Sequence, residues 1–178
     1  MSRYVAFLRG INLGKRQVKM DDLKTCLAGI GLTDLKTIVA SGNVSFATVE
    51  THDLKSRIEA AIADRFGFEV GVILRSIDDL QAMRYSAPFA GLDPKADLAR
   101  HVLLFDQPLP ADLKLDDRPG HTEIVGIGVR DIFLACYRQP NGRYTEGVED
   151  LAKQLDQQLG KAVLQTMRNF NTIEKALA

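Results

Sequence analysis

The order in which β-prone and helical segments follow one another constrains the fold of this chain more than any other feature. In residues 1–75 one strand is followed by a helix, two strands joined by a tight turn, a second helix and a fourth strand. Apolar residues spaced i, i+3, i+4 and i+7 indicate the helices, whereas β-branched runs indicate the strands. Strands are predicted at 3–9, 35–39, 44–49 and 69–74, and helices at 21–30 and, after an N-cap at Thr51, at 54–66.

Residues 100–178 repeat this order. Strands are predicted at 101–105, 122–127, 131–137 and 162–166, with a short helical turn at 110–113, a helix at 148–159 and a last helix capped by Asn171. Residues 76–99 form a linker, in which Ser76 and Asp79 have capping-box spacing and open a short helix. The expected fold is α+β, with two tandem ferredoxin-like (βαββαβ) halves, 1–75 and 100–178, whose antiparallel sheets carry helices on one face.

The bulk composition narrows the class of protein. The 178 residues carry a formal net charge of zero, so nucleic acid is not an expected partner. No stretch approaches the roughly 20 apolar residues of a membrane helix, and the N-terminus lacks the apolar core and cleavage site of an export signal. We therefore expect a soluble, cytoplasmic protein with no membrane partner.

Cysteine and histidine give no sign of a metal or cofactor site. Cys26 and Cys136 are isolated and lack the CxxC spacing of a zinc site or dithiol. The histidines, His52, His101 and His121, lack the paired spacing that metal ligands use. We expect no disulfide, no metal and no cofactor, and the pattern assigns no catalytic residue.

Two polar segments of the first half are expected to converge. In a ferredoxin-like half the third strand lies between the second and the first, so the loop at 10–19 and the hairpin at 41–43 emerge at the same end of the sheet. Basic side chains, glycines and a following helix N-terminus suit a phosphate or carboxylate. The alternative is that the glycines only shape a turn and the hairpin residues only close it. The candidate ligand-binding residues are Arg9, Asn12, Lys15, Lys19, Ser41 and Asn43.

Arg168 and Asn169 form a second polar group, after the predicted last strand and before the last helix. One interpretation is helix capping and hydrogen bonding to backbone. The other is that they reach the same polar site from the second half, as further ligand-binding residues.

Three separated motifs resemble those of a known bacterial family. Residues 7–12 (FLRGIN), 40–46 (ASGNVSF) and 166–172 (TMRNFNT) are similar, in the same order, to the family called domain of unknown function 1697. The resemblance extends nearly from end to end. It implies a pair of ferredoxin-like domains and no particular activity.

The expected function is the binding of a small anionic metabolite or nucleotide at the two convergent loops. An enzyme with its active site in a cleft between the halves is the alternative, although no nucleophile or metal set is evident. A second alternative is an RNA-binding module, for which Phe46 is the only aromatic residue on the third strand. The sequence does not indicate an oligomeric state.

Overall fold

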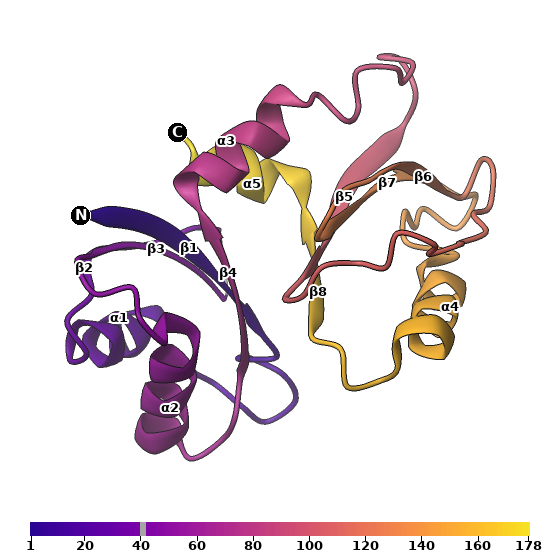
Figure 1. Cartoon of the computed structure of the whole chain (residues 1–178). Coiled ribbons are helices and arrows are strands. Elements are labelled where there is room, and N and C mark those ends of the chain that lie inside the picture. Colours follow the sequence, from indigo (N-terminus) through magenta and orange to yellow (C-terminus); the bar gives the residue numbers. More distant parts are fainter. Residues whose placement is uncertain (40–41) are drawn as a thin grey trace. The chain divides into compact units, whose positions relative to one another are not determined.

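The computed structural model describes residues 1–39 and 42–178 (Figure 1). The chain divides into two compact units: unit one comprises Met1–Ala82 with Thr172–Ala178, and unit two comprises Met83–Asn171. Each unit is built on a four-stranded antiparallel sheet. The predicted α+β class is therefore confirmed. In the described part of the chain, no helix combines the length and apolar character that crossing a membrane requires.

The sheet of unit one has the strand order β2-β3-β1-β4. Its strands are β1 (Ser2–Arg9), β2 (Thr33–Thr37), β3 (Asn43–Thr48) and β4 (Gly71–Ser76). The run from Val5 to Leu8 is buried on both faces of the sheet, as suits a central strand, and β1 pairs antiparallel with both β3 and β4. As predicted, β3 lies between β2 and β1.

Helices α1 (Met20–Ala28) and α2 (Leu54–Phe66) cover one face of this sheet. Their apolar side chains repeat at helical spacing and form one core with the sheet residues that point toward them. The predicted N-cap Thr51 is wrong, because α2 is preceded by Asp53 in the left-handed region (φ 48°) and begins at Leu54. The core includes Leu23 and Leu27 of α1, Ile58 and Ile62 of α2, and Ala6, Leu8, Phe46 and Val72 of the sheet.

Helix α3 (Ile77–Tyr85) begins in unit one directly after β4. The Ser76 N–H donates to Asp79 Oδ2 at 3.1 Å, and the Asp79 N–H donates to Ser76 Oγ at 3.0 Å. This reciprocal pair is the capping box that the sequence predicts, and it satisfies two backbone donors that the helix start leaves without partners.

Unit two has the strand order β6-β7-β5-β8. Its strands are β5 (Leu98–Phe105), β6 (Thr122–Ile127), β7 (Asp131–Tyr137) and β8 (Gln165–Asn169). Helix α4 (Val148–Leu159) buries Leu151 and Leu155 against Leu103, Phe105 and Leu134 of this sheet. The last helix, α5 (Phe170–Ala176), follows β8 directly.

The segment between β5 and β6 replaces a helix with irregular chain. The helical turn predicted at 110–113 is reduced to one hydrogen bond, from the Leu113 N–H to the Pro110 carbonyl at 3.2 Å. Prolines at 108, 110 and 119 remove backbone donors that a helix would need. Side chains of α4 bind this backbone instead: Gln154 bonds both the N–H and the carbonyl of Asp116, and Gln158 does the same for Lys114.

The closing strand also differs from its prediction. β8 occupies Gln165–Asn169 rather than 162–166, and it pairs with β5 from His101↔Asn169 to Phe105↔Gln165. Arg168 and Asn169 therefore lie within the strand and do not follow it. The physical reason is alternation: Met167 points into the core beneath α4, which places Thr166 and Arg168 on the opposite face.

Candidate functional site

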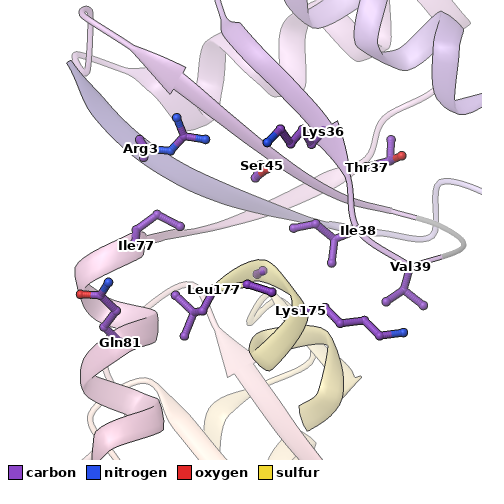
Figure 2. Close-up of a pocket in the computed structure, with 12 residues that line it drawn as sticks. Arg3, Lys36, Thr37, Ile38, Val39, Ser45, Ile77, Gln81, Lys175 and Leu177 are labelled. Atoms are coloured by element: carbon purple, nitrogen blue, oxygen red, sulfur yellow. The ribbon is translucent and has the colours of Figure 1, made fainter.

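A pocket of about 410 Å³ lies in unit one, on the sheet face opposite α1 and α2 (Figure 2). Ala6 and Leu8 of β1 face the two helices, so the alternate residues Arg3 and Val5 face the other way. Ser45 pairs with Val5 on one side and with Lys36 on the other. Arg3, Ser45 and Lys36 consequently share the face that forms the floor of this unit-one pocket.

Three cationic side chains line the unit-one pocket. They are Arg3 from β1, Lys36 from β2 and Lys175 from α5. Arg3 Nη1 lies 3.3 Å from Asp34 Oδ2, an ion pair in which both side chains are about half exposed. No acidic side chain occurs among the described lining residues. All the charged side chains among the described lining residues are therefore cationic, although the protein as a whole has zero net charge.

Uncharged polar groups lie between the cations. Ser45 is 9% exposed on the sheet floor, and Figure 2 shows Arg3 and Lys36 on either side of it. Thr37 and Gln81 add a hydroxyl and an amide. Hydroxyl and amide groups beside cations provide the donors that phosphate and carboxylate oxygens accept.

Aliphatic side chains complete the lining. Ile38 and Val39 come from the hairpin that follows β2, Ile77 from the start of α3, and Leu177 from the end of the described chain. The described lining contains no aromatic residue. The pocket therefore presents cations and polar groups on its floor and aliphatic carbon on its walls.

Asn43 shapes the hairpin from within. Its side chain is 3% exposed, and its Nδ2 donates to the Ile38 carbonyl at 3.0 Å. The Ile38 N–H donates to the Asn43 carbonyl at 2.8 Å. Both backbone groups of Ile38 are thus held by one residue, and Ile38 and Val39 are positioned at the pocket wall. The structure therefore places Asn43 beneath the hairpin that forms this wall.

The loop residues proposed from the sequence lie at the end of β1. As predicted, this end adjoins the hairpin, because the Leu8 N–H donates to the Gly42 carbonyl at 2.7 Å. Asn12 Oδ1 accepts from the Val18 N–H at 2.7 Å and so organises the loop itself. Arg9, Lys15 and Lys19 are exposed, and Ser41 lies outside the described residues. None of the described members of this group lines the unit-one pocket.

Arg168 and Asn169 belong to unit two. Arg168 Nη1 donates to Thr166 Oγ1 at 2.6 Å and to the Met167 carbonyl at 3.0 Å, and burial lowers the pKa of this guanidinium. Asn169 Oδ1 accepts from the Asn171 N–H at 2.9 Å. Asn169, rather than the predicted Asn171, therefore caps the start of α5, because the helix begins at Phe170.

Sequence reasoning missed the cations of the unit-one pocket, although one of them could have been found. Alternation along β1 and β3 could have placed Arg3 and Ser45 on one face, because Ala6, Leu8 and Phe46 mark the other. Lys175 could not have been found, because it lies far along the sequence from the sheet and only the folded chain joins it to unit one.

Comparison with known proteins confirms the family resemblance. A family model described as "Protein of unknown function (DUF1697)" matches residues 1–133. A solved structure, that of the conserved bacterial protein SP0830 from Streptococcus pneumoniae, has a TM-score of 0.67 and 22% sequence identity, covering 98% of this chain and 96% of that chain. No curated protein matches the chain. The likeness to the solved structure concerns the fold alone.

Proposed function

The chain belongs to the DUF1697 family, whose function is unknown, and we propose that the protein binds a small organic anion in the unit-one pocket. The observation that carries this proposal is the set of three cations, Arg3, Lys36 and Lys175, in a lining without any described acidic residue. The volume of about 410 Å³ falls in the range of small-molecule sites. A metabolite-sized anion is therefore the ligand that this pocket suits best.

The lining favours binding over hydrolysis. General base or nucleophilic chemistry usually requires a histidine, a cysteine or a carboxylate within hydrogen-bond reach of the substrate. None of the described side chains around the pocket is one of these. An enzyme acting between the halves remains the alternative, and no observation within either unit favours it.

RNA binding is the second alternative, and the position of Phe46 argues against it. Base stacking on a sheet requires aromatic side chains that solvent can reach. Phe46 is fully buried beneath α1 and α2, with its ring centroid 6.1 Å from that of Tyr4 in the same core. We therefore keep a small anion, rather than a nucleic acid, as the proposed partner. Separately, we propose the cytoplasm as the location of the protein.

We also propose that each unit has a ferredoxin-like βαββαβ arrangement. Both sheets support this view, since each places its third strand beside its first and its fourth strand on the other side of the first. Unit two departs from the arrangement by replacing its first helix with the segment bound by Gln154 and Gln158.

Thermal unfolding against a panel of carboxylates, phosphorylated metabolites and nucleotides tests the proposed function. A ligand at 100 times its dissociation constant stabilises the fold by about 2.7 kcal/mol, which for a chain of this length raises the midpoint by about 5–11 °C. We expect Lys36→Ala to abolish the shift. Lys19→Ala is the matched control, because it removes another exposed lysine, from the loop after β1.

The two variants separate the possible sites. A shift that survives Lys36→Ala and disappears in Lys19→Ala would move the site to the loop and overturn the pocket. An absence of stabilisation by every anion in the panel would overturn the proposed function itself.

A further inference from the structure

Resting on the proposed anion site, we infer that the ligand carries an aliphatic body that packs against Val39. The inference names the ligand class: a short-chain aliphatic carboxylate or phosphate monoester, whose anionic group is bound by Arg3 and Lys36. It also assigns Val39 a role in ligand selection. Val39 combines a left-handed backbone, a half-exposed apolar side chain and a position in the lining of the unit-one pocket.

The backbone of Val39 is strained. Its φ angle is +56°, in the left-handed region. A β-branched residue is a genuine outlier there, since its Cβ substituents approach the following carbonyl, and glycine, asparagine or aspartate normally fills such a position. The preceding residue, Ile38, is held by two hydrogen bonds to Asn43.

Burial of the Val39 side chain does not offset this strain. It is 49% exposed, and it is not among the side chains that form the core beneath α1 and α2. A strained and exposed apolar residue breaks two local rules at once. Such violations are expected at functional sites, where another requirement outweighs local stability. Val39 lines the unit-one pocket, so contact with a ligand would meet that requirement.

The chemistry of the remaining lining narrows the ligand. Ile38, Ile77 and Leu177 are aliphatic, like Val39, so the walls offer carbon contacts without ring faces. Among the described lining residues, a nucleotide base would find no aromatic side chain on which to stack, and a ribose would find no carboxylate side chain to accept from its hydroxyls. An anionic head with an aliphatic body matches both parts of the lining.

Calorimetric titration with matched probes tests this inference. Hexanoate and hexyl phosphate each combine an anionic head with an aliphatic chain, acetate and inorganic phosphate supply the heads alone, and adenosine monophosphate supplies a nucleotide. We expect one hexyl probe to bind at least about tenfold more tightly than its head alone, because the chain buries apolar surface. The tighter of the two hexyl probes identifies the head group.

Val39→Gly then gives two readouts of opposite sign. Without ligand, relief of the strain should raise the unfolding midpoint by about 2–4 °C. With the tighter hexyl probe, the affinity should fall about tenfold, because the isopropyl contact is lost. Val39→Thr is the matched control, since it keeps the β-branch and the strain but replaces one methyl group with a hydroxyl. It should weaken the hexyl probe without raising the midpoint.

Each outcome bears on one proposal. If adenosine monophosphate binds in a manner that needs Lys36 while the hexyl probes gain nothing over their heads, the anion site stands and the aliphatic class is overturned. If the hexyl probe binds Val39→Gly as tightly as the unchanged protein, the role of Val39 is overturned. If no probe binds but an anion of the thermal-unfolding panel stabilises the protein in a manner that needs Lys36, the anion site stands and the aliphatic class is overturned. If no anion of the panel stabilises the protein either, the proposed function fails together with this inference.

Discussion

The sheets of units one and two have the same strand order, but different elements cover one face of each sheet. In unit one, α1 and α2 both pack on the sheet, and Leu23, Leu27, Ile58 and Ile62 supply a continuous apolar layer. In unit two, α4 packs there beside an irregular segment that Gln154 and Gln158 hold by its backbone. An irregular segment can therefore take the place of a helix when side chains of a neighbouring helix bind its backbone N–H and carbonyl groups.

Truncating a buried side chain on α4 or α2 should have the largest effect on stability, and the two effects should differ. We expect Leu155→Ala in α4 and Ile62→Ala in α2 each to cost about 3 kcal/mol, a fall in midpoint of about 6–12 °C, because both side chains are almost fully buried. Leu155→Ala should cost more, since a displaced α4 also releases the segment that its glutamines bind. Calorimetric unfolding measures both, and an equal or smaller effect of Leu155→Ala would contradict the dependence of that segment on α4.

Removing one glutamine of α4 tests whether its hydrogen bonds hold the irregular segment. Gln154→Ala deletes two hydrogen bonds to the Asp116 backbone, at 2.8 Å each, and we expect a cost of about 1–2 kcal/mol. Hydrogen exchange should show faster exchange of the Asp116 amide. Gln157→Ala, on the exposed side of the same helix, should change stability by less than about 0.5 kcal/mol. An unchanged exchange rate at Asp116 would show that Gln154 does not hold the segment.

The capping box of α3 provides a smaller perturbation in unit one. Ser76→Ala removes the hydroxyl that accepts from the Asp79 N–H, and a cost of about 1 kcal/mol is expected. Ser56→Ala, at an exposed position inside α2, is the matched control and should be neutral or slightly stabilising. Urea unfolding distinguishes the two, and equal midpoints would mean that the cap contributes nothing.

A pH dependence from unit two should be the smallest effect. Burial lowers the pKa of His101 below its usual 6.5, so the unfolded chain binds a proton that the folded protein does not. The contribution of His101 to stability is therefore complete above about pH 6.5, and it is lost as the pH falls from there through the lower pKa of the folded state. His101→Gln should flatten the dependence of the urea midpoint between pH 7 and 5. A slope unchanged by this substitution would assign it to other groups.

The sequence predicted what depends on neighbours along the chain. Ser76 and Asp79 form their capping box because the motif spans one helical turn. The predicted pairing of the two strands around the hairpin is also seen, because the Ile38 N–H donates to the Asn43 carbonyl. The adjacency of the loop after β1 to that hairpin followed from strand order alone.

What escaped prediction depends on contacts distant in sequence. The pocket joins Arg3 and Lys36 to Gln81 and Lys175, and no local pattern connects these positions. Alternation is too weak a signal to fix the bounds of a short strand. The prediction therefore placed the last strand at 162–166, whereas β8 begins at Gln165 and includes Arg168 and Asn169. The lining cations were thus missed, while residues of the turn motifs were favoured by their chemistry.

Unit one is discontinuous along the chain, since residues 172–178 rejoin it after all of unit two. During synthesis from the N-terminus, the first 82 residues can form their sheet early, but Lys175 and Leu177 reach the pocket only after the ribosome has made everything between. The lining of the proposed site is therefore incomplete on a nascent chain that stops short of α5. Binding of the proposed anion would therefore distinguish chains that have been synthesised through α5 from shorter ones.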